Sequence, residues 1–159
     1  MATKRKLTWI EKLNKEQQPK VEKTDKKLRE RWGGETMLIA TPKMVQELVA
    51  QIPRGKVTTV NLIREKLARQ NGTDITCPIT TGIFLWIVAN AMEEMRTAGA
   101  KKIVPYWRVL KEGGKLNEKF PGGLDEHAAK LEAEGFSIVN NRAGKKTYVA
   151  DYEKKLFQF

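Results

Sequence analysis

The stretch Ile103-Val104-Pro105-Tyr106-Trp107-Arg108-Val109 is the part of the chain from which the rest of the fold can be worked out. It lies between a long helical pattern and a glycine turn, and it is apolar on both flanks. Pro105 fixes one backbone angle and favours an extended conformation at Val104. Two aromatic side chains and a cation follow directly, which suits a platform for stacking a base or another planar group. The alternative is that Tyr106 and Trp107 are ordinary core aromatics with satisfied polar atoms.

The composition of the chain bounds the kinds of partner it can have. Its 159 residues, 40% of them hydrophobic, suffice for one domain with one core. A net charge of +11 predicts polyanionic partners, with nucleic acid ahead of an anionic membrane. No stretch has the length of a transmembrane helix and no secretory signal pattern opens the chain, so we expect a cytoplasmic monomer without a membrane partner. One cysteine, Cys77, and one histidine exclude an internal disulfide and argue against zinc, and no cofactor is expected.

Residues 1–36 form a basic segment that includes Lys4-Arg5-Lys6 and Lys26-Lys27. Apolar residues from Leu7 to Leu13 fall on one side of a short helix. We expect this helix to dock and the remainder to form a partly extended arm along phosphates, with a solvated charged tail as the alternative. The folded domain is then expected to cover residues 37–159.

Three apolar patterns with helical spacing predict the central helices. Residues 41–52 begin with a threonine cap followed by proline and keep an apolar stripe. Thr59 can cap a second helix, and Thr80 or Thr81 begins the longest one, which runs to about Thr97. Two helices joined in this way, the second longer, predict a helix-turn-helix.

Further along the chain, the segments 136–139 and 147–149 are rich in apolar residues and flank the polar segment 140–146. Alternating extended segments around an Asn- and Gly-containing tip predict a β-hairpin. Because lysine and arginine occupy that tip, the hairpin has the character of a basic wing.

Three motifs complete a set with the Pro105 stretch: Ile52-Pro53-Arg54-Gly55-Lys56-Val57, Pro121-Gly122-Gly123-Leu124 and Glu132-Ala133-Glu134-Gly135. In this order and spacing they resemble the DNA-binding domain of the methylated-DNA–protein cysteine methyltransferases and the related, non-catalytic alkyltransferase-like proteins. The resemblance covers roughly residues 41–157. It implies an α/β, mainly α fold, the winged helix-turn-helix of the alkyltransferase C-terminal domain with a small β-hairpin wing. It also implies that the second helix approaches double-stranded DNA from the minor groove.

The departures from the family fall on its chemistry. Where the family reads Pro-Cys-His-Arg-Val, this chain has Tyr106 at the position of the alkyl-accepting cysteine and Trp107 at the position of the histidine. Glu134 remains at the position of the family's glutamate. Alkyl transfer needs a thiolate nucleophile and a base, whereas a phenol titrates near ~10 and an indole accepts no proton. We therefore expect the protein not to be an enzyme.

Other positions of the family pattern are altered as well. The arginine that fills the gap left by a flipped base falls at Thr81, and the tyrosine at the start of the first helix falls at Val60, whereas Asn90 keeps the family's asparagine. Thr81 is too short to replace a base in the stack, which argues against efficient flipping. Cys77 is expected to be a small buried group and His127 to lie at the surface.

Three functions remain open from the sequence. The first is a non-catalytic DNA-binding protein that recognises alkylated or distorted DNA for repair. The second is an interaction module whose apolar groove binds a protein or small planar ligand, with no DNA role, and the third is an alkyltransferase using Cys77 or Tyr106, although nothing activates either residue. Under the first, the centre that contacts the base is expected at Tyr106, Trp107, Arg108, Asn90, Pro121, Gly122 and Gly123. The DNA backbone is expected to contact Lys56, Thr80, Thr81, Lys101, Arg142, Lys145 and Lys146.

Overall fold

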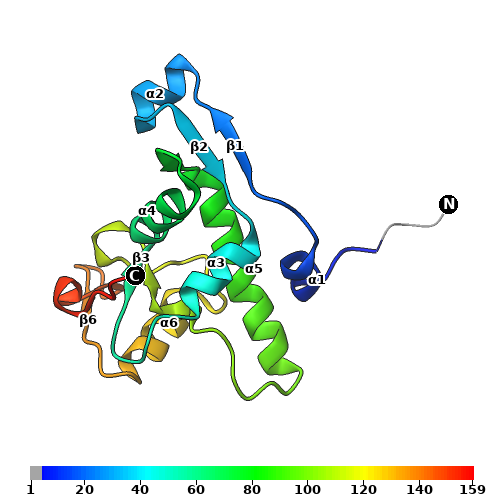
Figure 1. The fold of residues 1–159 in the computed structure, drawn as a ribbon. Coiled ribbons are helices and arrows are strands. Elements are labelled where there is room, and N and C mark those ends of the chain that lie inside the picture. The colour runs from blue at the N-terminus through cyan, green and yellow to red at the C-terminus, as the bar shows by residue number, and fades with distance from the viewer. Residues whose placement is uncertain (1–4) are drawn as a thin grey trace.

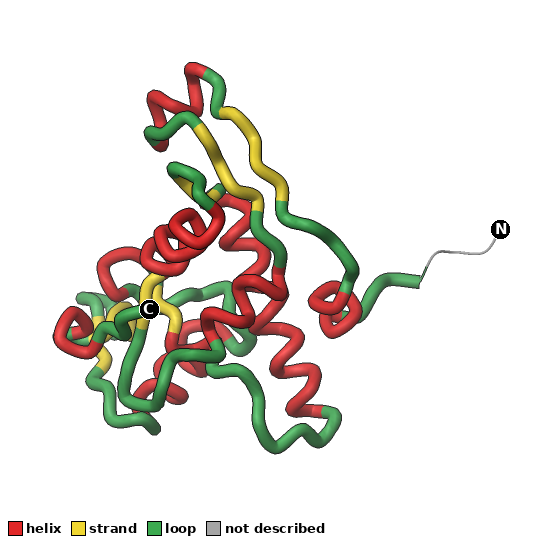
Figure 2. The backbone as a smooth tube through the Cα atoms, viewed as in Figure 1, coloured by secondary structure: helices red, strands yellow, loops and turns green. Residues whose placement is uncertain are grey.

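The computed structural model describes residues 5–159, and Figure 1 shows shorter helices arranged around one long helix. Lys4 and the rest of residues 1–4 of the expected arm lie outside the described residues. Figure 2 shows that helices dominate and that the strands are short, so the α/β, mainly α class predicted from the sequence is confirmed. The helices are α1 (Trp9–Asn14), α2 (Lys26–Trp32), α3 (Pro42–Val49), α4 (Val60–Asn71), α5 (Pro78–Thr97) and α6 (Gly123–Glu132), with 3-10 turns η1 (Tyr106–Arg108), η2 (Glu112–Gly114) and η3 (Tyr152–Lys155). The strands are β1 (Lys20–Lys23), β2 (Thr36–Ile39), β3 (Thr58–Thr59), β4 (Ile75–Thr76), β5 (Val109–Leu110), β6 (Ile138–Asn140) and β7 (Lys146–Val149).

Helices α4 and α5 form the helix-turn-helix that the sequence predicted. Thr59 caps α4 through its side chain, and Gly72 ends the helix in the left-handed conformation with φ of 67°. Helix α5 begins at Pro78, slightly before the predicted Thr80 or Thr81, because a proline in the first turn has no N–H that needs an intrahelical partner. Its 20 residues correspond to a length of ~30 Å.

Residues 5–35 contain a short docked helix, as the sequence predicted, and beyond it a paired strand and a second helix, where the sequence predicted a partly extended arm. The short helix is α1, which packs along α5 with Leu13 only 2% exposed. The ring centroids of Trp9 and Trp86 lie 4.6 Å apart in an edge-on arrangement. The carboxylate of Glu94 on α5 accepts the first two N–H groups of α1 at 3.2 Å, so α5 itself caps the docked helix.

The segment after α1 joins a sheet with strand order β1-β2-β4. Strand β1 pairs antiparallel with β2, and β2 pairs in parallel with β4 immediately before α5. The expected boundary between arm and domain at residue 36 therefore falls at the first residue of β2. Asp74 reinforces this junction, because its carboxylate accepts N–H bonds from Glu35 and Thr36 at 2.8 and 3.1 Å.

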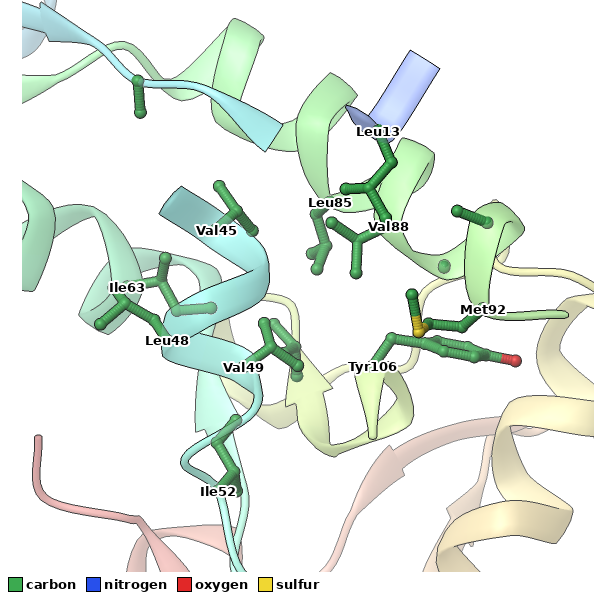
Figure 3. Close-up of a cluster of buried hydrophobic side chains, with 14 of the residues drawn as sticks. Leu13, Val45, Leu48, Val49, Ile52, Ile63, Leu85, Val88, Met92 and Tyr106 are labelled. Carbon is green, nitrogen blue, oxygen red and sulfur yellow. The ribbon is translucent and has the colours of Figure 1, made fainter. Parts of the chain in front are cut away.

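The main core lies between α3, α5 and η1, and Figure 3 shows its side chains converging. Helix α3 contributes Val45 and Val49, α5 contributes Val88 and Met92, and Tyr106 of η1 closes the cluster on one side (Figure 3). A second cluster joins α6 to the C-terminal hairpin and consists of Val57, Leu110, Leu116, Ala128, Leu131, Phe136 and Val149. Trp107 packs against both clusters, so η1 is held where the two cores meet.

The predicted wing is present as the antiparallel pair β6–β7, with an irregular register between Val139 and Asn140. The side chain of Asn141 accepts the N–H groups of Ala143 and Lys145, both at 2.9 Å, and so shapes the tip. In the part of the chain that the structure describes, no helix is long and apolar enough to cross a bilayer.

Candidate nucleic-acid interface

The predicted centre is assembled by the single turn η1 at the end of the loop that follows α5. The N–H of Tyr106 donates to the carbonyl of Val104 at 2.8 Å, and that of Arg108 donates to Pro105 at 3.1 Å. Proline therefore forces a tight turn here rather than a continuing strand. This turn sends the side chain of Tyr106 toward α5 and those of Trp107 and Arg108 toward Glu134.

Tyr106 fills the interior of the domain and does not present its ring to the surface. It is 1% exposed, and its hydroxyl donates to Oε1 of Glu93 on α5 at 2.8 Å. Its ring packs edge-on against Trp107 and Phe120, with centroids 5.3 and 5.2 Å away. Burial, together with the neighbouring Glu93 carboxylate, raises the pKa of Tyr106 well above its ordinary value. The alternative of a core aromatic is thus the correct one for Tyr106, and the prediction that it contacts a bound base does not fit this buried position.

Glu93 is a member of the centre that the sequence analysis did not identify. Burial acts to raise its pKa, but hydrogen bonds from Tyr106 and Arg96 and the nearby charge of Lys130 hold the pKa below its usual value. The Nζ of Lys130 lies 3.4 Å from Oε1 of Glu93 and 5.4 Å from the centre of the Trp107 ring. The carboxylate is therefore charged and ties α5, α6 and η1 together. Glu93 lies one turn after Asn90 on α5, and this spacing could have identified it from the sequence as a member of the centre.

Trp107 and Arg108 converge on one carboxylate, that of Glu134. The indole Nε1–H donates to Oε2 at 2.6 Å, and the guanidinium donates through Nε and Nη2 at 2.9 and 3.0 Å. Nη1 of Arg108 also donates to the carbonyl of Ile52 at 2.6 Å, which connects the first motif of the set to the last. The side chains of Arg108 and Glu134 are 14% and 6% exposed, so this is a nearly buried ion pair. Trp107 keeps a hydrogen bond to the glutamate, but an indole nitrogen only donates and cannot act as a base.

His127 is buried, and the prediction that it lies at the surface is wrong. It is 1% exposed, its Nδ1 accepts the N–H of Asn117 at 3.0 Å, and its Nε2 lies 2.8 Å from the carbonyl of Trp107. Burial lowers the pKa of His127 to about 4, against a weaker opposing effect of the Trp107 carbonyl. The ring is therefore neutral, with Nε2 carrying the proton. Its spacing from Leu124 and Leu131 places it on the apolar face of α6, which was the missed signal.

The turn Pro121-Gly122-Gly123 lies beside this centre, and its role as a wall for a bound ligand stays a prediction. Phe120 immediately before the turn is 2% exposed and packs on Tyr106. Gly122 has φ of +83°, and a Cβ there would overlap the side chain of Glu126, so glycine is required at the start of α6. Asn90 is half-buried in the interior of α5 and donates its side-chain N–H to the carbonyl of Trp86, one turn earlier, at 2.9 Å.

A groove of about 810 Å³ runs between the first half of α5 and the segment 111–119. Its apolar side is formed by one face of α5, on which Ile79, Ile83 and Trp86 are 61%, 47% and 41% exposed. Val60 also lines it. Residues 79, 83 and 86 are three or four positions apart and so share one face of a helix, a spacing that is visible in the sequence. None of the three was among the expected site residues. The lining residues are Val60, Pro78, Ile79, Gly82, Ile83, Leu85, Trp86, Lys111, Glu112, Asn117, Glu118 and Lys119.

The residues expected to contact the DNA backbone do not form one cluster. Thr81 is 1% exposed and donates its hydroxyl to the carbonyl of Cys77 at 2.6 Å, so it does not reach the surface as predicted. Thr80 makes a longer contact of 3.5 Å with the same carbonyl. Lys101 follows the C-terminal end of α5, so the length of that helix separates it from the groove. Lys146 forms an ion pair with Glu132. Lys56, Arg142 and Lys145 are exposed, the last two at the tip of the wing.

Comparison with known proteins agrees with this geometry. Residues 40–136 match the family described as "6-O-methylguanine DNA methyltransferase, DNA binding domain". The chain belongs to this family. The matched residues include the helix-turn-helix, Trp107 and Glu134, whereas β1, α2 and the wing lie outside them.

Two solved structures are similar to this chain. One is S. pombe Atl1 in complex with damaged DNA containing O6-carboxymethylguanine, at 24% identity and a TM-score of 0.50, covering 74% of this chain and 94% of that one. A second is S. pombe ATL in complex with DNA, at 23% identity and a TM-score of 0.49 over the same shares of the two chains. No curated protein matches the chain. The expected alkyltransferase-type winged helix-turn-helix is thus confirmed.

Proposed function

We propose that this protein is a non-catalytic, alkyltransferase-like DNA-binding protein that recognises alkylated or distorted duplex DNA. The observation that carries the proposal is the occupant of the family's reactive position. Tyr106 there is buried and bonded to Glu93, while Trp107 takes the place of the histidine and donates to Glu134. The family fold is retained, but the nucleophile and the base are both replaced.

The chemistry of the described residues argues against alkyl transfer. An alkyl acceptor must lose a proton and reach the alkyl carbon. The phenol of Tyr106 is held protonated by burial and by its carboxylate partner. The side chains packed around it leave it almost without contact with solvent. Cys77 is 7% exposed at the start of α5, and its carbonyl oxygen rather than its sulfur faces the threonine hydroxyls of the helix. His127 accepts a backbone N–H and so cannot serve as a base for either group.

The support for DNA comes from charge and from shape. A net charge of +11 favours a polyanion, and the wing tip offers Arg142 and Lys145 without a carboxylate partner among residues 5–159. The groove along α5 supplies an apolar surface of the size of a small planar group. The structure of S. pombe Atl1 holds DNA with O6-carboxymethylguanine, which is the class of lesion we propose here.

Because α5 offers isoleucine and tryptophan where a base-reading helix would carry polar side chains, we propose that recognition rests on shape and apolar contact. Few hydrogen bonds to base edges imply weak sequence preference. The protein is proposed to act as a monomer and in the cytoplasm. Sedimentation analysis of the free protein and of its DNA complex tests the stoichiometry.

The proposal is tested by titrating the protein against matched duplexes with guanine or O6-alkylguanine at one position, each at two salt concentrations. We expect tighter binding to the alkylated duplex, little dependence on flanking sequence, and a log–log salt slope of about −0.9 for each phosphate neutralised. Equal binding to both duplexes would contradict lesion recognition, and no binding at low salt would contradict any DNA-binding function.

A second candidate function is an interaction module that binds a protein or small planar ligand, and two observations favour it. Arg108 is withdrawn into its ion pair with Glu134, so it does not join Lys56 and Lys101 in a continuous basic stripe. The face of α5 that a recognition helix would offer to DNA is apolar. Under this reading a duplex would neither bind at low salt nor protect the groove.

A further inference from the structure

We propose that residues 20–35, which we name the basic projection, bind the phosphate backbone of duplex DNA beyond the helix-turn-helix. The basic projection comprises β1, α2 and the turns that join them to β2. It stands away from the rest of the domain at the top of Figure 1. It lies outside the residues that match the family, and the inference rests on the DNA-binding function proposed above.

The basic projection is rigidly attached although it buries almost nothing. All residues of β1 are exposed and α2 has no buried residue. Its base is nevertheless fixed: Thr24 donates its hydroxyl to the carbonyl of Gly34 at 2.7 Å and its N–H to Glu35 at 2.9 Å. Gly34 has φ of +79°, and a Cβ there would lie 2.8 Å from Cβ of Asp74, so glycine permits the close approach. An ordered element that contributes little to the core leaves most of its surface open to solvent and to a binding partner.

That surface is rich in cations that have no partner. Six basic side chains are carried by β1 and α2, and none of them makes an ion pair or donates a side-chain hydrogen bond to residues 5–159. Of the acidic residues, Asp25 is engaged as the cap of α2, where it accepts the N–H of Leu28 at 2.8 Å. The six are Lys20, Lys23, Lys26, Lys27, Arg29 and Arg31.

Local stability accounts for Arg29 and Arg31, which lie in the last turn of α2, but not for the lysines. Lys26 and Lys27 stand in the first turn of α2, and that turn contains no acidic residue. A positive charge at this end of a helix opposes the peptide dipoles and is unfavourable. Arg31 lies over the ring of Trp32, with its guanidinium carbon 5.5 Å from the ring centre, so it remains at the surface. Lys26 and Lys27 therefore suit an external polyanion better than they suit the stability of α2.

The position of the basic projection relative to α5 identifies the polyanion. Strand β2 pairs with β4, and the N–H of Cys77, directly before α5, donates to the carbonyl of Leu38 at 2.8 Å. The projection thus begins at the N-terminal end of α5, which is also the end that forms the groove. A duplex lying against the groove continues past this end of the helix. Phosphates on the extended duplex would then meet the lysines, while base edges remain with α5.

The test compares two duplexes that differ in length, one of about 10 base pairs, or one helical turn, and one of about 20 base pairs. Salt titrations are measured for the parent protein and for the Lys26→Ala/Lys27→Ala variant. On the longer duplex we expect the variant to lose roughly 1.8 from the magnitude of the log–log salt slope, because each phosphate contact contributes ~0.9. On the shorter duplex, the two proteins should have the same slope.

The Lys26→Arg/Lys27→Arg variant is the matched control and should keep the parent slope on both duplexes. Equal slopes for the alanine variant and the parent on the longer duplex would overturn the inference while leaving the proposed function intact. A parent protein that binds neither duplex would overturn both. Protection of Lys26 and Lys27 from an amine-reactive reagent, measured on the parent, provides a second readout that needs no variant: the longer duplex should protect them, and unchanged labelling would contradict the proposal.

Discussion

The indole N–H of Trp107 donates to Oε2 of Glu134 at 2.6 Å. The same carboxylate receives two donors of Arg108 and is 6% exposed. One carboxylate thus anchors two consecutive side chains of η1. Its function here is to hold η1 against α6.

Replacement of Glu134 by alanine should therefore be costly. It leaves the charge of Arg108 nearly buried without a counter-ion, and breaking such a pair costs about 3–5 kcal/mol. Chemical denaturation should show this loss in the free energy of unfolding. Glu134→Gln, which keeps an acceptor for Trp107, should lose less. A loss below ~1 kcal/mol for the alanine variant would show that Glu134 does not hold the turn.

Tyr106 should behave as a core residue. Tyr106→Ala removes a fully buried ring and should lower the free energy of unfolding by about 3–5 kcal/mol. Tyr106→Phe removes only the hydrogen bond to Glu93, for an expected loss of about 1.5–3 kcal/mol. Thermal and denaturant melts measure both. If Tyr106→Ala instead weakens DNA binding while melting like the parent, Tyr106 contacts the ligand and its buried placement is wrong.

The stability of the protein should depend on pH through its single histidine. The pKa of His127 is lowered to about 4 in the folded state, whereas the unfolded chain titrates near ~6.5. Between these values the unfolded state binds more protons, so stability should rise with pH from 4 to 6.5 and level off above, with a slope approaching ~1.4 kcal/mol per pH unit. Denaturation midpoints across this range provide the measurement. His127→Gln is the control and should flatten the dependence; identical slopes for the two proteins would exclude this origin.

A charge placed in the groove should disrupt DNA binding without disturbing the fold. Ile83 is 47% exposed on α5, and Ile83→Glu would set a carboxylate against the phosphates and the apolar surface. We expect DNA affinity to fall at least about tenfold, or ~1.4 kcal/mol, with stability within ~0.5 kcal/mol of the parent. Leu7→Glu is the matched control, because Leu7 is 46% exposed and lies away from the groove lining. Similar affinities of the two variants would argue that the groove does not face DNA.

The helix-turn-helix could be predicted from the sequence because its signals are local. The hydroxyls of Thr41 and Thr59 accept the backbone N–H three residues further along the chain and so cap α3 and α4. Gly72 ends α4 in the left-handed conformation that glycine favours. The apolar stripes then fix which faces are buried. Caps, stripes and family motifs together were enough for the fold.

The site was harder to predict because its geometry depends on distant partners. Whether Tyr106 faces a ligand or the core depends on Glu93, which belongs to another helix. The docking of α1 depends on Glu94, some 85 residues away along the chain. His127 was misplaced because a histidine among polar neighbours in sequence can still lie on the buried face of its helix. No local pattern encodes such pairings.

The central claim is that the protein binds alkylated DNA and does not accept the alkyl group. It is tested most directly by incubating the protein with a duplex whose O6-methylguanine carries a labelled methyl group, and by measuring the bound fraction and the label on protein in the same sample. We predict that the duplex is retained by the protein and that all label stays on DNA, because Tyr106 is protonated and buried and Trp107 cannot take a proton. Stoichiometric transfer of label to any residue of the protein would contradict the account.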